Sequence, residues 1–522
     1  MFQSVPNTEL TCTICGGFWQ DTDVKLRDLQ RGEDQGCSTC NIMLQAINSF
    51  LPWILWRAGP LKAAILSVDA IVFHWDASNK AIYYEGTPEY PLYLSTDGEV
   101  ETGHQLFSQH DTASGDTGTV ASLRRIPPWI NTCISQHSAC GEPKDTPLPR
   151  RVLEIGETEG ALIKLYESQN ELARYACLSH RWGTGQPIVT TSESYDKLVK
   201  GIPSEELPLT FRDAVSVARR LSIRYLWIDC FCIIQDNAKD LEEACAMMDV
   251  IFENAFLTIA ATRSEGPDDG LFVRRYAERR IQRLQIPGTE FWGKSDIYVR
   301  NFNHGEEDDL SSQHWITAGF SQGFSSGWPL LLRGWVFQER ILSPRMLHFG
   351  NEITWECRSE SVCECNFKAS SGALQDSKHR LREEGCSLWS SESSTSTLHL
   401  TWKRVVEEYS ELASNLTYER DIFPALSGLA SRFSRLLSDE YVAGMWRKHL
   451  IQGLLWVVPS SPEGGVPLKW RAPTWSWASV CCAVSRVSRM RTGWEFALRR
   501  APKRKLDLVS ANMSSQVESG EA

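Results

Sequence analysis

The chain has 522 residues, of which 42% are hydrophobic and 23% are charged, so most of it should fold around buried cores. Its 54 basic and 65 acidic residues give a formal net charge of −11, which argues against general nucleic-acid binding. Residues 1–10 lack an apolar core, and the most apolar stretch, residues 51–73, is interrupted by charges and a Gly-Pro pair. We therefore expect neither a signal peptide nor a membrane span, and we expect a cytoplasmic protein with reduced thiols.

Two Cys-x-x-Cys pairs stand near the start of the chain, Cys12 with Cys15 and Cys37 with Cys40. Pairs at this separation are typical of zinc ribbons, in which each turn presents two thiolates to one tetrahedral ion. Four ordinary buried thiols would fit the same pattern. We expect residues 1–160 to form a Cys-containing module, with these four residues as candidate ligands of a structural zinc ion.

A second cluster consists of Cys133, His137 and Cys140. Steps of four and three residues place these side chains on one face of a helix. That face could hold a metal, or it could be a packed stripe with one hydrogen-bonded histidine. The packed stripe is favoured, because no fourth ligand is identifiable nearby in the sequence.

The middle of the chain predicts alternating strands and helices. Apolar runs at 175–179, 225–229 and 256–261 indicate buried strands, and helical stripes cover 209–221 and 240–252. Strand, helix, strand, helix, strand is a βαβαβ arrangement, for which a parallel sheet is expected.

Polar residues follow the ends of these predicted strands. They are Ser179, His180, Arg181 and Asp229. Ligands of parallel sheets bind beyond the carboxyl ends of the strands, so these four are candidate catalytic or binding residues. A buried Asp229 needs a partner, and Arg181 or Arg212 is expected to supply it. No dinucleotide fingerprint or phosphate-binding loop is present, so no cofactor-binding residue is predicted.

Several sequence blocks stand in a distinctive order: YACLSHRWG at 175–183, LPLTFRDA at 207–214, RYLWIDCFCIIQD at 224–236, FENA at 252–255 and RGWVFQER at 333–340. In order and spacing they resemble the HET (heterokaryon incompatibility) domain family of filamentous fungi. We place the HET domain at 173–345. PTWSWA at 473–478 resembles the family's usual C-terminal region, which we place at 346–480.

The resemblance implies a role in nonself recognition, in which such proteins trigger growth arrest and programmed cell death. The family's domain is similar to the TIR fold, some members of which cleave NAD. An α/β core of TIR-like or flavodoxin-like type is therefore expected, with a mixed α+β, Trp-rich C-terminal region. The implied partners are other incompatibility or signalling proteins, or a second copy of the chain. The alternatives are an NAD-cleaving or other nucleotide-processing enzyme, with NAD as its substrate, and a pathway-associated protein of unknown chemistry.

Two departures from the family pattern bear on these alternatives. The family helix after the Gln-Asp block usually carries a Glu where this chain has Ala244, and Glu243 lies one residue early, about 100° around the helix. Glu243 stays a candidate acid, but its offset favours signalling through protein contacts over catalysis. The tail at 481–522 is basic and polar, and we expect it to be disordered. It carries a candidate nuclear-import patch at Arg499, Arg500, Lys503, Arg504 and Lys505.

Overall fold

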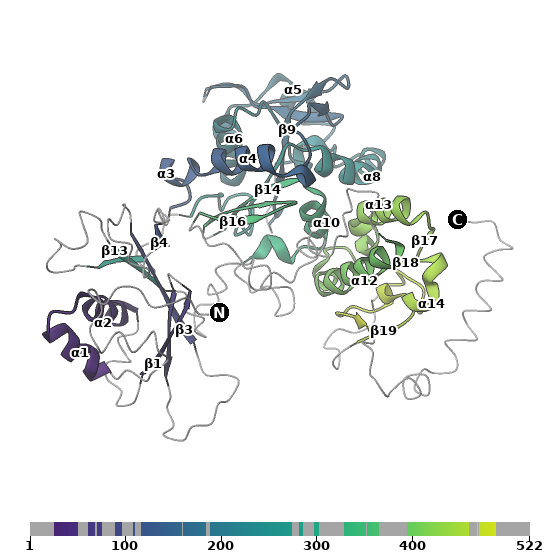
Figure 1. The fold of residues 1–522 in the computed structure, drawn as a ribbon. Helices are drawn as coiled ribbons and strands as arrows, with labels where there is room; N and C mark the ends of the chain where they lie inside the picture. The colour runs from purple at the N-terminus through teal and green to yellow at the C-terminus, as the bar shows by residue number, and fades with distance from the viewer. Residues whose placement is uncertain are drawn as a thin grey trace.

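The structure is a computed structural model, and it describes residues 26–50, 61–67, 70–75, 89–96, 108–109, 116–158, 160–183, 188–273, 281–284, 297–301, 328–350, 352–364, 394–458, 467 and 469–486. Within these ranges the chain forms two large sheets and a mainly helical C-terminal part (Figure 1). None of the helices in them combines the length and the apolar character that crossing a membrane requires. Cys12, Cys15 and the predicted basic patch at 499–505 lie outside the described residues.

The N-terminal part pairs two helices with a six-stranded sheet. The helices are α1 (Leu26–Asp34) and α2 (Ser38–Phe50). The strands are β1 (Leu61–Ser67), β2 (Ala70–Trp75), β3 (Glu89–Thr96), β4 (Ser108–Gln109), β12 (Ile281–Leu284) and β13 (Ile297–Asn301). They run in the order β1-β2-β3-β13-β12, and β4 pairs with β3. The last two strands come from inside the predicted HET segment, and β13 lies antiparallel to β3 with Ile297 opposite Thr96.

The central sheet has eight strands in the order β16-β15-β14-β11-β9-β10-β6-β7. Their bounds are β6 (Arg151–Glu154), β7 (Lys164–Glu167), β9 (Tyr175–Ser179), β10 (Tyr225–Trp227), β11 (Leu257–Ala260), β14 (Arg345–Phe349), β15 (Ile353–Cys357) and β16 (Ser361–Cys363). The four inner strands, β14, β11, β9 and β10, are parallel. Antiparallel pairs complete both edges. The predicted α/β class and the parallel pairing of β9, β10 and β11 are confirmed, within a sheet that is mixed overall.

Helices cover both faces of the central sheet. They are α3 (Val120–Leu123), α4 (Ile126–Gln136), α5 (Tyr195–Lys200), α6 (Leu209–Arg220), α7 (Asp229–Cys232), α8 (Ala238–Asn254) and α10 (Gly334–Leu342). Along β9, Ala176 and Leu178 pack with α4, α5 and α6, whereas Tyr175 and Cys177 pack with α8 and α10. The pleat sends successive side chains to opposite faces, so a strand buried on both sides reads as a continuous apolar run. Asp229 begins α7 and does not end a strand, which corrects the predicted strand at 225–229.

The C-terminal part packs on α8 and α10. It contains α12 (Thr395–Leu412), α13 (Ser427–Leu437), α14 (Leu450–Gly453), β17 (Tyr441–Val442), β18 (Met445–Trp446), β19 (Trp456–Val457) and β20 (Ser485–Arg486). Two short strands, β5 (Thr146–Pro147) and β8 (Leu172–Ala173), pair beside the central sheet. Gly444 organises the aromatic core, because the indoles of Trp402 and Trp477 both donate to its carbonyl oxygen at 3.0 Å. Its φ of +91° and the close Trp477 ring leave no room for a side chain.

Candidate functional site

The carboxyl ends of the parallel strands bring polar side chains to one edge of the central sheet. Ser179 is the last residue of β9 and His180 follows it, while Asp229 lies two residues beyond β10. Ser179 lies opposite Ala260, the last residue of β11, in the parallel register. Ends of parallel strands are where ligands of such sheets bind, and the predicted cluster of Ser179, His180 and Asp229 is present there.

His180 and Asp229 face each other without a close hydrogen bond. The His180 Nε2 atom lies 3.7 Å from Asp229 Oδ1, and it has no hydrogen-bond partner among the described residues. The Trp182 indole donates to Asp229 Oδ2 at 2.9 Å, and the Cys230 backbone N–H donates to Oδ1 at 2.7 Å. Burial lowers the pKa of the His180 imidazole, and the Asp229 carboxylate opposes that shift. We therefore expect a neutral imidazole beside an aspartate that is held by an indole and a backbone amide.

Ser179 is bound to an acid that is not among the predicted site residues. Its hydroxyl donates to Oε2 of Glu339, on α10, at 2.5 Å. Burial raises the pKa of the Glu339 carboxyl to about 7, while the Ser179 hydroxyl and the Arg333 guanidinium act in the opposite direction. Arg333 also donates to the backbone carbonyl of His180. The carboxyl is therefore poised to change its protonation near neutral pH.

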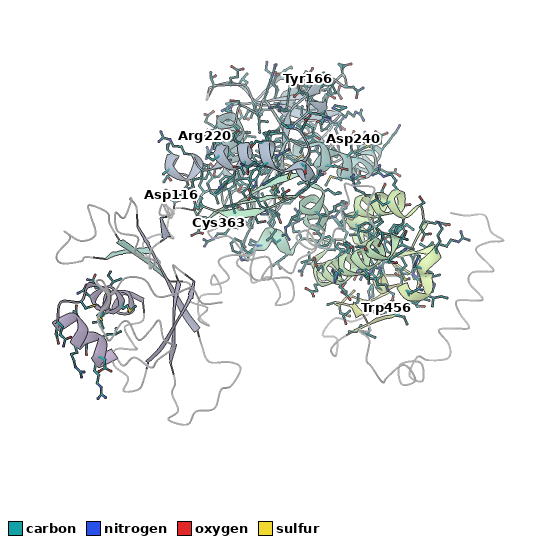
Figure 2. All side chains as sticks on the ribbon, viewed as in Figure 1. Asp116, Tyr166, Arg220, Asp240, Cys363 and Trp456 are labelled. Carbon is teal, nitrogen blue, oxygen red and sulfur yellow. The ribbon has the colours of Figure 1, made fainter. Side chains whose placement is uncertain are left out.

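Two of the predicted site residues lie apart from this cluster. Arg181 is half-buried, and among the described residues neither it nor Arg212 forms an ion pair with Asp229. The predicted arginine partner is therefore wrong: the indole of Trp182 holds the carboxylate instead. Glu243 lies on the outer face of α8, where its side chain is 51% exposed and its Oε2 is 3.2 Å from Arg150 Nη1. Through Arg150 it belongs to an ion-pair network with Asp240 (labelled in Figure 2), whose side chain is buried.

The sequence of α10 itself indicates that Glu339 is a buried acid. Its helix reads GWVFQERIL, in which Gln, Glu and Arg interrupt an apolar run. All three of these polar side chains are buried. A charged group within an otherwise apolar helix must find partners inside the fold. That pattern identifies Glu339 and Arg340 as members of buried polar networks, although it does not indicate their partners.

Among the residues that the structure describes, three groups of side chains lie close enough together to hold a metal ion: Cys133, His137, Cys140 and Cys357; His180, Asp229 and Cys230; and His399, Asp439 and His449. In the second group both carboxylate oxygens of Asp229 already accept hydrogen bonds, from the Trp182 indole and from the Cys230 backbone N–H. In the third, burial and the neighbouring His449 lower the pKa of His399 to about 4. The predicted N-terminal zinc site stays a prediction: Cys37 follows α1 and Cys40 is buried in α2, and their expected partners are not described.

Fold and site together define a mixed α/β domain with a buried polar cluster at the carboxyl edge of its parallel strands. Residues 175–339 match the family model described as heterokaryon incompatibility protein (HET). The chain therefore contains a domain of the heterokaryon incompatibility family, as its sequence blocks predicted. It matches no curated protein and no solved structure.

Proposed function

We propose that this protein acts in fungal heterokaryon incompatibility, where it signals growth arrest and cell death through protein contacts. The match of residues 175–339 to the HET family supports the incompatibility role. The expected partners are other incompatibility or signalling proteins, or a second copy of the chain. The strand-end cluster, which consists of Ser179, His180, Asp229 and Glu339, is mostly buried. This observation favours signalling through protein contacts over catalysis.

The strand-end cluster is closed to a substrate. Ser179 is 1% exposed, His180 3% and Glu339 6%. A group that acts on a substrate must reach it at hydrogen-bond distance, and the rest of the protein covers these three side chains almost completely. The Asp229 side chain, by contrast, is 25% exposed, and Trp182 beside it is half-buried. We infer that the buried groups fix the backbone at 180–182 and at α7, so that Asp229 and Trp182 form part of a contact surface.

Inducible expression of the full chain in a filamentous fungus tests this proposal. We expect growth arrest with the wild type and loss of arrest with Asp229→Ala, because the Trp182 indole then loses its acceptor. Arg181→Ala is expected to act in the same direction, because Arg181 is half-buried and lies between His180 and Trp182 in the turn after β9. Asp268→Ala is the matched control, since Asp268 is an exposed aspartate of the same domain. Full arrest with both Asp229→Ala and Arg181→Ala, at equal protein abundance, would contradict the proposed surface.

An NAD-cleaving enzyme is the second candidate, and one observation favours it. Numbered along the chain, the parallel strands β9, β10, β11 and β14 lie in the order 2-1-3-4, which is that of flavodoxin-like sheets with ligand sites at their carboxyl ends. Glu339 places an acid with a pKa near 7 at this edge, as glycosidic chemistry uses. This candidate requires the cluster to open. NAD cleavage by this chain would also have to occur without the family Glu, because Ala244 stands at that position and packs beside the core.

Purified protein distinguishes the two candidates. We expect the folded, soluble wild-type protein to release no nicotinamide from NAD. If the family Glu is catalytic, Ala244→Glu should create the activity. If it is structural, Ala244→Glu should only lower stability, because it adds a charge to a half-buried position. Nicotinamide release by the wild type that is lost in both Asp229→Ala and Glu339→Gln would establish the enzyme instead.

A further inference from the structure

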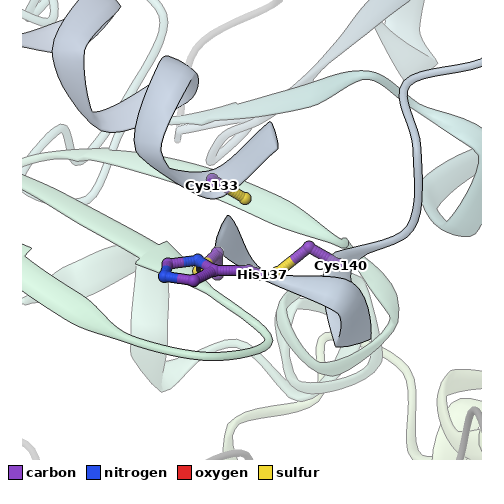
Figure 3. Close-up of side chains that lie close together, drawn as sticks. Cys133, His137 and Cys140 are labelled. Carbon is purple, nitrogen blue, oxygen red and sulfur yellow. Dashed lines mark hydrogen bonds between the residues drawn. The ribbon is translucent and has the colours of Figure 1, made fainter. Parts of the chain in front are cut away.

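Four metal-binding side chains converge where α4 meets the β15–β16 hairpin. Cys133 is buried in α4, His137 follows that helix, and Cys140 closes the short 3-10 helix at Ser138–Cys140. Figure 3 shows these three side chains gathered in one place. The fourth is Cys357, the last residue of β15, which lies 220 residues from His137 in sequence. One ligand atom from each residue lies within 4.8 Å of all the others.

The spacing of these atoms fits a tetrahedral ion. Zinc binds thiolate sulfur at about 2.3 Å and imidazole nitrogen at about 2.0–2.1 Å, so neighbouring ligands of a tetrahedral site lie about 3.8 Å apart for two sulfurs and about 3.6 Å for sulfur and nitrogen. Cys357 Sγ is 3.4 Å from His137 Nδ1. The other separations need to shorten by no more than about 1 Å to reach these values. Three cysteines and one histidine are a common ligand set of structural zinc sites.

The groups around the four side chains are arranged as they are around bound metals. The backbone N–H groups of Ser359 and Glu360 point to Cys357 Sγ, at 3.4 and 3.3 Å. Such donors stabilise a thiolate, and a sulfur atom that accepts two amides in one turn is well placed as a ligand. On the other side of the imidazole, His137 Nε2 lies 3.6 Å from Glu360 Oε1. A carboxylate on the second nitrogen orients a histidine ligand and increases its basicity.

The burial of the cluster and a nearby cation support the same interpretation. Cys133, Cys140 and Cys357 are all buried. Three thiolates and one neutral imidazole around Zn²⁺ would carry a net charge of −1, which needs compensation in a buried place. Arg345 lies next to the cluster, and its Nη2 donates to the carbonyls of Cys140 and Gly141 at 3.3 and 2.8 Å.

We propose that Cys133, His137, Cys140 and Cys357 bind a structural zinc ion. The ion ties the α4 segment to the β15–β16 hairpin at the edge of the central sheet. It is separate from the predicted N-terminal site, and it does not depend on the proposed signalling function. The sequence favoured a packed stripe for Cys133, His137 and Cys140 because it showed no fourth metal ligand nearby. Strand β15 supplies that ligand, Cys357, from a distant part of the chain.

The metal content of full-length protein, purified without chelator, tests the site. We expect Cys357→Ser to lower the zinc content by about one ion per chain relative to the wild type. Cys363→Ser is the matched control: it changes a buried cysteine on the same hairpin, and the new hydroxyl can still donate to Glu352 as the Cys363 thiol does at 2.8 Å. This control should keep all of its zinc. Cys37→Ser reports separately on the N-terminal cysteines.

Cobalt substitution identifies the ligands. In Cys37→Ser protein, Co²⁺ should give the visible bands of a tetrahedral ion together with thiolate charge-transfer bands, and Cys357→Ser in the same background should lose them. Zinc content that does not change with Cys357→Ser would overturn the proposal, as would a disulfide between any two of the three cysteines in freshly purified protein. If Cys357→Ser does not fold, X-ray absorption of the Cys37→Ser protein decides: one zinc with three sulfurs and one nitrogen supports the site, and absence of zinc refutes it.

Discussion

Glu339 is the residue through which pH should act most directly on the strand-end cluster. The carboxyl faces the Ser179 hydroxyl, the Arg333 guanidinium and the Asp229 carboxylate. Burial raises its pKa to about 7 from an ordinary value of 4.5. A carboxyl that is harder to ionise in the folded state contributes stability below its unfolded pKa, and it loses that contribution as the pH rises through the folded value.

Glu339→Gln should remove this pH dependence. We expect the free energy of unfolding of the wild type to fall between pH 6 and pH 8 by about 1 kcal/mol more than that of the variant, because glutamine keeps the shape and does not ionise. Urea denaturation at three pH values within this range measures the difference. Parallel profiles for the two proteins would mean that Glu339 titrates as an ordinary acid.

Sequence analysis missed several site residues for one physical reason. Glu339 meets Ser179 across 160 residues, and Cys357 meets His137 across 220. Periodicity along the chain reports which face of an element is buried, but it does not report which distant element supplies the partner. Asp229 shows the same limit, because the indole of Trp182, two residues after His180, holds the carboxylate and not the expected arginine.

At the scale of elements, α8 joins the central sheet to the C-terminal part. It contacts both α13 and α10 (Figure 1). Helices α8 and α13 lie close together at Gly428 of α13, where an added Cβ would lie 2.4 Å from the Cβ of Asp249. The backbone N–H of Gly428 also donates to Gln338 Oε1 of α10 at 3.2 Å. Three helices therefore meet at one residue that has no side chain.

Gly428→Ala should separate these helices. The methyl group has no space, so we expect a loss of about 1–3 kcal/mol in the free energy of unfolding. This loss should exceed the helix-propensity gain of about 1 kcal/mol that alanine brings. Chemical denaturation measures the change, and Ser431→Ala, at an exposed position of the same helix, is the control. A variant as stable as the wild type would show that the α8–α13 contact has space for the added methyl group.

The elements that were predicted well are those whose pattern is local. Strands β9, β10 and β11 and helices α6 and α8 agree with the predicted positions to within two residues at every end. Both α6 and α8 carry an apolar stripe that alone indicates a helix. The fourth parallel strand, β14, and the antiparallel edges were not predicted. A short buried strand such as RMLHF does not show in sequence which neighbour it pairs with.

At the scale of the whole molecule, one hydrophobic core serves two parts of the chain. Trp227 and Phe252 from the HET domain and Tyr409, Phe433 and Trp477 from the C-terminal part belong to the same buried cluster. Each part thus covers an apolar surface of the other. Large uncovered apolar surfaces favour association in water.

A fragment of residues 116–364 should therefore not behave as an independent domain. We expect it to bind more hydrophobic dye and to self-associate more than residues 116–486, which leave β13 equally without β3 but keep the C-terminal part. Dye fluorescence and light scattering at matched concentrations measure both properties. Co-expression of 394–486 in trans should reduce the aggregation. A monomeric fragment with cooperative unfolding and no dye binding would show that the shared core is dispensable.

The pairing of β13 with β3 has a consequence for synthesis on the ribosome. Strand β3 ends at Thr96, yet its partner begins at Ile297, and the central sheet is complete only with β16, which ends at Cys363. At a synthesis rate of about 5–20 residues per second, β13 is made roughly 10–40 seconds after β3. During that time its free edge is open to wrong pairing. Efficient production of this protein should therefore depend on chaperones that bind nascent chains, and slower translation should increase that dependence.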